Sequence, residues 1–133
     1  MAALYEYGIA QLMAGNIDLV NDEIAALLVN TEVYTVDLEN DRAEEDIPEA
    51  AVLAEKRLTA NTLDGTTFRA DATTFPGVEG AQAGAVVIFK NTEYLETCTL
   101  IAYLDNAPGL PVTPTGDDIT VSWDPGVNGI FKL

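Results

Sequence analysis

The segment Gly84–Lys90 reads GAVVIFK, and the five residues between its glycine and its lysine are all apolar. Successive side chains of a strand point to opposite faces, so Ala85, Val87 and Phe89 would share one face, with the two residues between them on the other. A strand that is apolar on both faces is typical of the centre of a sheet covered on both sides. The segment therefore predicts a buried central strand.

Other strand patterns lie on both sides of this segment. Ile24–Val29 is apolar throughout and fits a strand or a helix by periodicity alone; we favour a strand that Glu32–Val36 continues. Thr66–Thr74 alternates. One face is expected to carry Phe68, Ala70 and Ala72, and the other Thr67, Arg69, Asp71 and Thr73. The full set of further predicted strands is Ala51–Ala60, Thr66–Thr74, Thr97–Asp105, Ile119–Trp123 and Gly129–Leu133.

Turn residues separate these strands. Asp64-Gly65 is a strong turn signal, and the prolines and glycines of Asn106–Asp118 preclude regular structure there. Strands at a spacing of about ten residues indicate antiparallel β-structure. We therefore expect one mostly β domain over residues 1–133, an antiparallel β-sandwich or barrel of jelly-roll-like type, with an N-terminal helix. No internal repeat is evident, and the indole of Trp123, which alternates with apolar residues, is expected in the core.

The N-terminal residues predict a helix over Ala3–Ala14, within an arm formed by residues 1–15. Its apolar side chains recur at a spacing of three to four, and Gly15-Asn16 supplies the stop. Gly8 weakens this helix by about 1 kcal/mol relative to alanine. The apolar stripe consists of Leu4, Tyr5, Ile9, Leu12 and Met13.

Residues 37–49 form the most acidic part of the chain, with seven acids against Arg42 alone. Such a stretch is unsuited to a core, so we expect a solvated loop, with room for one helical turn. Its aspartate spacing lacks the glycine and the terminal glutamate of an EF-hand, which argues against a calcium site.

Charge and length limit the classes of function. The 133 residues have a mass of 14.2 kDa, and their 22 acids and 6 bases give a formal net charge of −16. Binding to nucleic acid through phosphates needs clustered lysine and arginine, so we expect no direct nucleic-acid partner. No stretch of about 20 apolar residues predicts a membrane span, and the first residues carry Glu6 without a base, unlike a signal peptide. We expect no membrane partner.

The residue types that carry catalysis are scarce. The chain has no histidine, which removes histidine-based acid–base chemistry, Ser-His triads and histidine metal ligands. Its single cysteine, Cys98, lies in an apolar run and is expected to be a small buried filler. The single serine, Ser122, lies in a strand-like run. We therefore expect no enzyme, with no catalytic, metal-binding or cofactor-binding residues and no cofactor.

Three stretches resemble a known family. They are LYEYGIAQLMAGNIDLVND at 4–22, AVVIFKNT at 85–92 and TLIAYLDNAPGLPVTPTGDDITVSWDPGVNGIFKL at 99–133. Together they resemble small virion proteins of tailed bacteriophages, encoded among head and tail structural genes, whereas residues 37–82 match least. The resemblance implies a capsid decoration, or cement, protein that forms a homo-oligomer on the capsid exterior. Its partner would be the major capsid protein, and it would be made in the host cytoplasm.

Charge supports an outer location, because packaged DNA would repel a subunit of charge −16. The expected contact residues are Leu4, Tyr5, Ile9 and Leu12 of the helix, with Leu110 and Val112 of the Pro-Gly loop. One alternative is a head–tail completion or tail structural protein, which the sequence does not separate from a decoration protein. Another, drawn from charge alone, is an acidic DNA mimic that inhibits a DNA-binding enzyme; its acids should be spread evenly, whereas here they concentrate around one loop.

Overall fold

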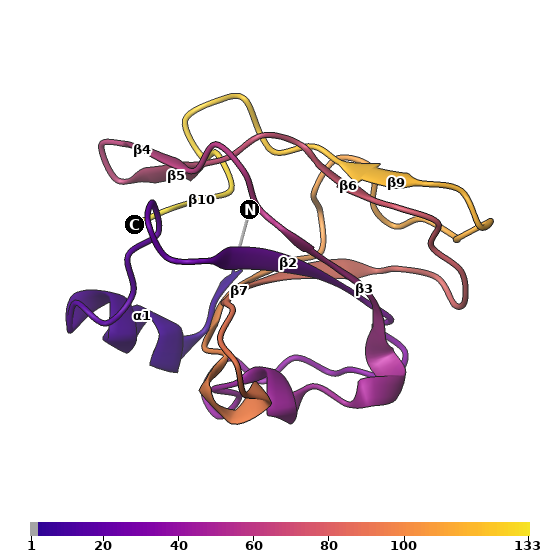
Figure 1. The fold of residues 1–133 in the computed structure, drawn as a ribbon, viewed down its shortest axis with the longest axis horizontal. Coiled ribbons are helices and arrows are strands. Elements are labelled where there is room, and N and C mark those ends of the chain that lie inside the picture. Colours follow the sequence, from indigo (N-terminus) through magenta and orange to yellow (C-terminus); the bar gives the residue numbers. More distant parts are fainter. Residues whose placement is uncertain (1–2) are drawn as a thin grey trace.

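Five antiparallel strands form the largest sheet of the computed structural model, which describes residues 3–133 (Figure 1). In spatial order they are β1 (Ala3–Leu4), β8 (Leu100–Leu104), β7 (Ala85–Lys90), β2 (Ile24–Val29) and β3 (Val52–Arg57). Strand β7 pairs with β2 along its whole length, and both strands are buried. The prediction of a central strand at GAVVIFK is confirmed, as is the strand at Ile24–Val29.

One face of this sheet is covered by two small sheets. The three-stranded sheet has the order β10 (Phe131–Lys132), β5 (Thr67–Arg69) and β4 (Thr62–Asp64), and the two-stranded sheet pairs β6 (Thr73–Phe75) with β9 (Ile119–Val121). Phe68 and Phe75 of these sheets pack on the alternate residues Ile24, Ala26 and Leu28 of β2. We call this packing the upper core, after its place in Figure 1.

Trp123 belongs to the upper core, as predicted. Its side chain is buried, and its indole Nε1 donates a hydrogen bond of 2.9 Å to the carbonyl oxygen of Asp71. A buried indole N–H needs such a partner, because leaving it unpaired would cost the free energy of its lost hydration.

The other face of the large sheet is covered by chain without strands. The segment between β2 and β3 contains the 3₁₀ turns η1 (Glu44–Asp46) and η2 (Glu49–Ala51), and η3 (Leu95–Thr97) follows β7. Tyr34, Ile47 and Ala51 pack there on Ala25, Leu27 and Val29 of β2 and form the lower core. The protein is thus mostly β and sandwich-like. Over residues 3–133 its sheets do not close into a barrel, and they have five, three and two strands rather than the four and four of a jelly roll.

Helix α1 spans Glu6–Met13, shorter than the predicted Ala3–Ala14, because Ala3 and Leu4 pair with β8 instead. Residues 1–2 of the predicted arm lie outside the described residues. Gly8 is buried where the helix meets β8, and a Cβ atom there would overlap the carbonyl oxygen of Leu100. The helix is therefore docked on the sheet rather than extended as an arm. No helix in the described part of the chain has the length and apolarity needed to cross a membrane.

Two predicted strands are wrong in part. Glu32–Val36 is not a strand, because the Asn30 side chain accepts a hydrogen bond from the Glu32 N–H and the Asn30 carbonyl accepts two more, which turns the chain. Thr66–Thr74 is divided between β5 and β6, since the chain passes from one small sheet to the other. Alternation places Thr67 and Phe68 on opposite faces of β5, and both are buried; Thr73 is buried in β6. The turn at Asp64-Gly65 is confirmed, with Gly65 at φ +63°.

The acidic segment 37–49 is not simply a solvated loop. Most of its carboxylates are exposed, but Ala43 and Ile47 are buried in or beside the lower core. A chain of hydrogen bonds through the Tyr5 and Tyr34 hydroxyls and the Asp41 carboxylate attaches the acidic segment to the rest of the domain. Tyr34 Oη donates to Asp41 Oδ2 at 2.7 Å and lies 2.8 Å from Tyr5 Oη, which must donate to it. Burial raises the pKa of both phenols, so both stay protonated.

A six-residue pattern occurs twice, although no repeat was expected from the sequence. Ile17–Asp22 reads IDLVND and Val36–Asp41 reads VDLEND. In each copy the first aspartate accepts two backbone N–H bonds and one from the asparagine side-chain amide. The last aspartate accepts a hydrogen bond from the backbone N–H of the first aspartate. We call these the paired Asp turns. The bonds from Asn21 and Asn40 lower the pKa of the Asp18 and Asp37 carboxyls.

We expect Gly8→Ala to lower the free energy of unfolding by about 1–3 kcal/mol, because the added methyl group forces the helix away from β8. Helix propensity alone predicts the opposite, a gain of about 1 kcal/mol. Urea unfolding followed by circular dichroism measures the change. The exposed position Ala10 is the control, since Ala10→Gly should show the ordinary propensity cost. A more stable Gly8→Ala protein would mean that the helix is not held against the sheet.

Tyr34→Phe should cost about 1–3 kcal/mol of stability, because it removes the hydroxyl that joins Tyr5 to Asp41 and leaves a buried donor unpaired. Thermal and urea unfolding of the variant measure this loss. Tyr94→Phe is the matched control, because the Tyr94 side chain is exposed and its hydroxyl makes no described hydrogen bond. Equal stabilities of the two variants would contradict a structural role for the hydroxyl chain.

Candidate functional site

The predicted contact residues of the helix are mostly used for internal packing. Tyr5 is fully buried in the lower core, and Leu4 and Leu12 pack, half-buried, on the upper core. Ile9 is half-buried as well. The stripe therefore offers little free surface, because α1 lies against β8. Sequence periodicity located the apolar face of the helix but could not show that this domain covers it.

The predicted contact residues of the Pro-Gly loop are also partly covered. Leu110 and Val112 are half-buried and pack on the upper core. Val112 exchanges two backbone hydrogen bonds with Ala83, of 2.8 and 3.0 Å. The loop is therefore fastened to the molecule. Leu4 and Leu12 of the helix stripe pack on the same upper core as these two loop residues.

A different apolar cluster is exposed beyond the end of α1. Met13, Leu63 and Leu133 expose 83%, 52% and 54% of their surface. They border a hollow of about 520 Å³, which we call the helix-end hollow. In Figure 1 it belongs to the left side, where the C-terminus and the β4–β5 hairpin lie above α1. Its deeper residues are Leu12, Ile17, Leu19 and Phe131, and Asp18 is the one charged residue among the described residues that line it.

Sequence reasoning missed most of this cluster, because its members come from three distant parts of the chain. Met13 was recognised only as the end of the helix stripe. Leu63 lies beside a predicted turn, and Leu133 lies in a predicted strand. Large exposed apolar groups gathered in one place are uncommon on soluble proteins and mark contact surfaces.

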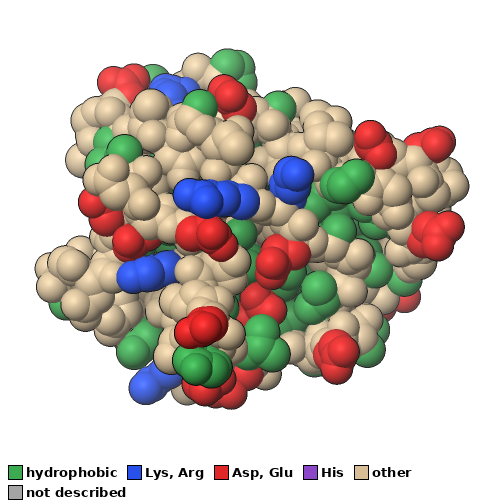
Figure 2. Space-filling view, in the orientation of Figure 1, with side chains coloured by type: hydrophobic (Ala, Val, Ile, Leu, Met, Phe, Trp, Pro, Cys, Tyr) green, Lys and Arg blue, Asp and Glu red, His purple; other side chains and the backbone are tan. Residues whose placement is uncertain are grey.

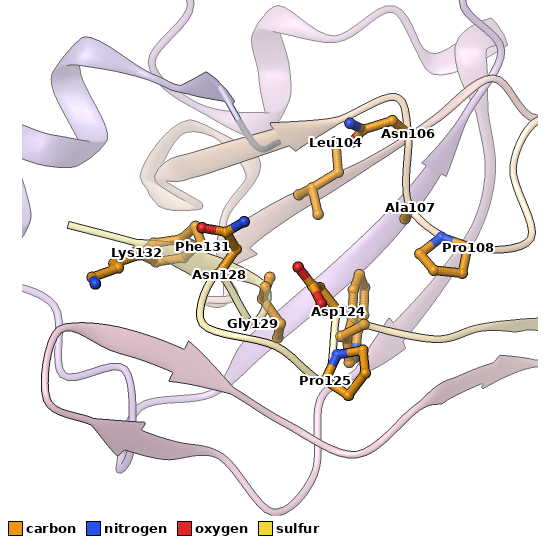
Figure 3. A pocket seen from close by; sticks show the side chains of 12 residues that line it. Leu104, Asn106, Ala107, Pro108, Asp124, Pro125, Asn128, Gly129, Phe131 and Lys132 are labelled. Carbon is orange, nitrogen blue, oxygen red and sulfur yellow. The ribbon is translucent and has the colours of Figure 1, made fainter.

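A second hollow, of about 260 Å³, lies between the start of the Pro-Gly loop and residues 123–132 (Figure 3). We call it the Trp123 hollow. Leu104, Ala107, Pro108, Pro125 and Phe131 supply apolar walls. The Asp124 carboxylate points into the space between them. The sequence indicated Asp124 only as a turn residue, and nothing in the pattern placed it opposite the Pro-Gly loop.

A third, polar hollow of about 620 Å³ lies between α1 and the acidic segment. It has the cations Arg42 and Lys90 together with three carboxylates. The Arg42 guanidinium lies 5.1 Å from the centre of the Tyr7 ring, and Lys90 pairs with Asp22 at 3.2 Å. Because both signs of charge are present, this hollow selects no one class of ion.

Between Ala3 and Leu133, no three His, Cys, Asp or Glu side chains gather closely enough to hold a metal ion. Cys98 is buried, as predicted, and its sulfur accepts a hydrogen bond of 3.3 Å from the Thr92 N–H. A reactive thiolate needs a nearby cation or base and some exposure, and this site provides neither among the described residues.

One carboxyl group is poorly placed for a negative charge. Glu44 Oε1 is buried without a hydrogen-bond partner in the described structure. Burial, and then the nearby charge of Glu55, raise the pKa of Glu44. A carboxyl whose folded pKa exceeds its unfolded value stabilises the fold at low pH, and that stability is lost as the pH rises through the folded pKa. At neutral pH the ionised Glu44 therefore costs stability.

We expect Glu44→Gln to raise the melting temperature at pH 7, because it removes that charge and gives Glu55 an amide donor. The advantage should disappear below the ordinary glutamate pKa of 4.5, where Glu44 itself is protonated. Scanning calorimetry at both pH values measures the difference. Glu45→Gln, at the exposed neighbouring position, separates the local effect from the general loss of one charge. An equal gain in both variants would assign the effect to net charge alone.

No protein-family model matches this chain, and no curated protein is similar to it at a significant level. The resemblance to phage virion proteins thus stays an expectation from the sequence, and the geometry of the surface is the remaining guide to function.

Proposed function

We propose that this chain is a structural subunit of a tailed-phage virion. In this proposal it binds the outer surface of the capsid as a homo-oligomer, with the major capsid protein as its partner, and stabilises the shell. The sequence resemblance of residues 4–22, 85–92 and 99–133 suggests the virion. The structural observation that carries the proposal is the helix-end hollow, an exposed apolar cluster on an otherwise strongly acidic molecule.

The helix-end hollow suits a permanent contact between proteins. Binding would bury apolar surface of its border residues Met13, Leu63 and Leu133. Each Å² of apolar surface removed from water contributes about 25 cal/mol to the binding free energy. Met13 ends α1, Leu63 lies in β4 and Leu133 follows β10, so the backbone that carries them is ordered before binding. A preformed apolar contact on a rigid domain is what a cement protein needs.

Net charge favours the outside of the shell. Figure 2 shows acidic side chains spread over much of the visible face, with the basic ones in its left and middle parts. The formal charge of −16 would repel packaged DNA and would attract a shell surface with exposed lysine and arginine. Such attraction depends on ionic strength, because salt screens exposed charges over about 10 Å at 0.1 M.

The first experiment is to measure this chain in purified virions of the phage that encodes it. Quantitative mass spectrometry should find a copy number of the same order as that of the shell protein, since decoration sites repeat with the shell. The few copies of a single ring would favour the head–tail completion or tail alternative. Absence from the virion would refute the proposal.

The second experiment tests the contact surface on undecorated shells. We expect Met13→Asp combined with Leu63→Asp to weaken binding by at least about tenfold, because charges would enter an apolar contact. Val33→Asp, an exposed apolar position on another part of the surface, is the control and should bind normally. Deletion of the helix is uninformative, since it would remove the buried Tyr5. Normal binding by the double variant would exclude the helix-end hollow as the contact.

A further inference from the structure

We infer that the Trp123 hollow is a binding site for one cationic side chain, a lysine or an arginine, presented by a protein partner. The site is separate from the helix-end hollow, and its test uses the isolated chain. The inference therefore stands or fails independently of the proposed virion function.

The size and walls of the hollow fit a single long side chain. Its volume of about 260 Å³ is below the range of roughly 300–1,000 Å³ that is typical of drug-sized ligands. The walls come from Leu104, Pro108, Pro125, Ile130 and Phe131, with Trp123 beside them. Lysine and arginine bury their methylene groups along apolar surface of this kind while the charged end seeks a polar partner.

Asp124 supplies the polar partner. Its carboxylate points into the hollow in Figure 3. Oδ1 accepts a hydrogen bond of 2.8 Å from the Gly126 N–H, whereas Oδ2 accepts none from the residues that the structure describes. The amide side chains of Asn106 and Asn128 also line the hollow and offer carbonyl oxygens to a cation.

The protein's own cations do not neutralise Asp124. Lys132 lines the hollow, but in Figure 3 its side chain extends away from Asp124, and no ion pair joins them in residues 3–133. Arg69 lies nearer, beside Pro125 and Gly126, but its ion pair is with Asp64 at 3.7 Å, and the described residues show none between Arg69 and Asp124. The negative charge in the hollow is thus left for an incoming group, and the formal charge of −16 raises the local concentration of cations.

The segment that carries Asp124 is held in place before any ligand arrives. The Arg69 guanidinium donates to the carbonyl oxygens of Pro125 and Gly126, at 3.4 and 2.6 Å. Thr67 Oγ1 donates to the Val127 carbonyl at 2.8 Å. A carboxylate fixed in this way loses little freedom on binding, which favours recognition.

Other classes of ligand fit less well. A calcium ion takes six to eight oxygen ligands, and one carboxylate with two amides supplies too few. An anion would be repelled by Asp124. A neutral apolar group would pack against the walls but would leave the Asp124 carboxylate partly dehydrated and without a partner. Only a group with methylenes and a terminal positive charge uses both parts of the hollow.

The sole tryptophan of the chain lines this hollow, so its signals report on binding directly. We would titrate the full chain with Nα-acetyl-lysine methylamide and with the arginine analogue. The readouts are Trp123 fluorescence and its indole N–H signal in ¹⁵N NMR spectra. We expect saturable changes with a Kd in the millimolar range, as befits one side chain. Nα-acetyl-norleucine methylamide, which lacks the charge, should bind at least about tenfold more weakly.

Asp124→Asn should weaken binding of the charged probes by about tenfold, while its amide oxygen still accepts the Gly126 N–H and keeps the turn. Glu32→Gln removes a charge at an exposed position outside the hollow and should leave binding unchanged. Asn128→Phe, at an exposed lining position, should block the hollow with Asp124 still present. Equal binding of lysine and norleucine probes, or wild-type affinity in both hollow variants, would overturn the inference.

Discussion

The paired strands β2 and β7 are apolar on both faces, and the rest of the structure depends on covering both. Burying apolar surface is the main free-energy gain of folding, so neither face can be left to solvent. The upper face takes the short strands β5, β6, β9 and β10, whose buried side chains include Phe68, Phe75 and Phe131, with β4 exposed at the edge of the three-stranded sheet. The lower face has no sheet to cover it and relies on 3₁₀ turns and loops. Those loops need side-chain hydrogen bonds, such as those of Tyr34, in place of a strand ladder.

Local patterns predicted the elements that short-range chemistry determines. The two-sided strand at GAVVIFK, the turn at Asp64-Gly65 and the buried indole of Trp123 could all be inferred from neighbouring residues. The errors arose where a side-chain hydrogen bond or a tertiary contact overrides the secondary-structure preference of the residues. Glu32–Val36 has strand-like composition, yet the Asn30 side chain turns the chain first. Gly8 lowers helix propensity, but its missing side chain is what allows α1 to touch β8.

The candidate surfaces were harder to predict than the fold. Tyr5 belongs to an apolar stripe that the sequence correctly places on one helix face, but periodicity does not show whether the same chain covers that face. The helix-end hollow joins Met13, Leu63 and Leu133 through the pairing of β10 with β5, and no local pattern encodes that pairing. Asp124 likewise gains its role only when the Pro-Gly loop folds opposite it. A surface made from separate segments of the chain can be located only when the tertiary structure is known.

The paired Asp turns stand on either side of β2, one before the strand and one after it. Each depends on an ionised aspartate with a lowered pKa, so its stability is present above the unfolded pKa and is lost as the pH falls through the folded value. The connections before and after β2 therefore both lose stability as the pH falls. Acid would weaken the turn on each side of β2, and the protection of the Asn21 and Asn40 amides against hydrogen exchange should fall as Asp18 and Asp37 become protonated. The repeat thus couples the stability of the turns before and after β2 to the protonation of Asp18 and Asp37.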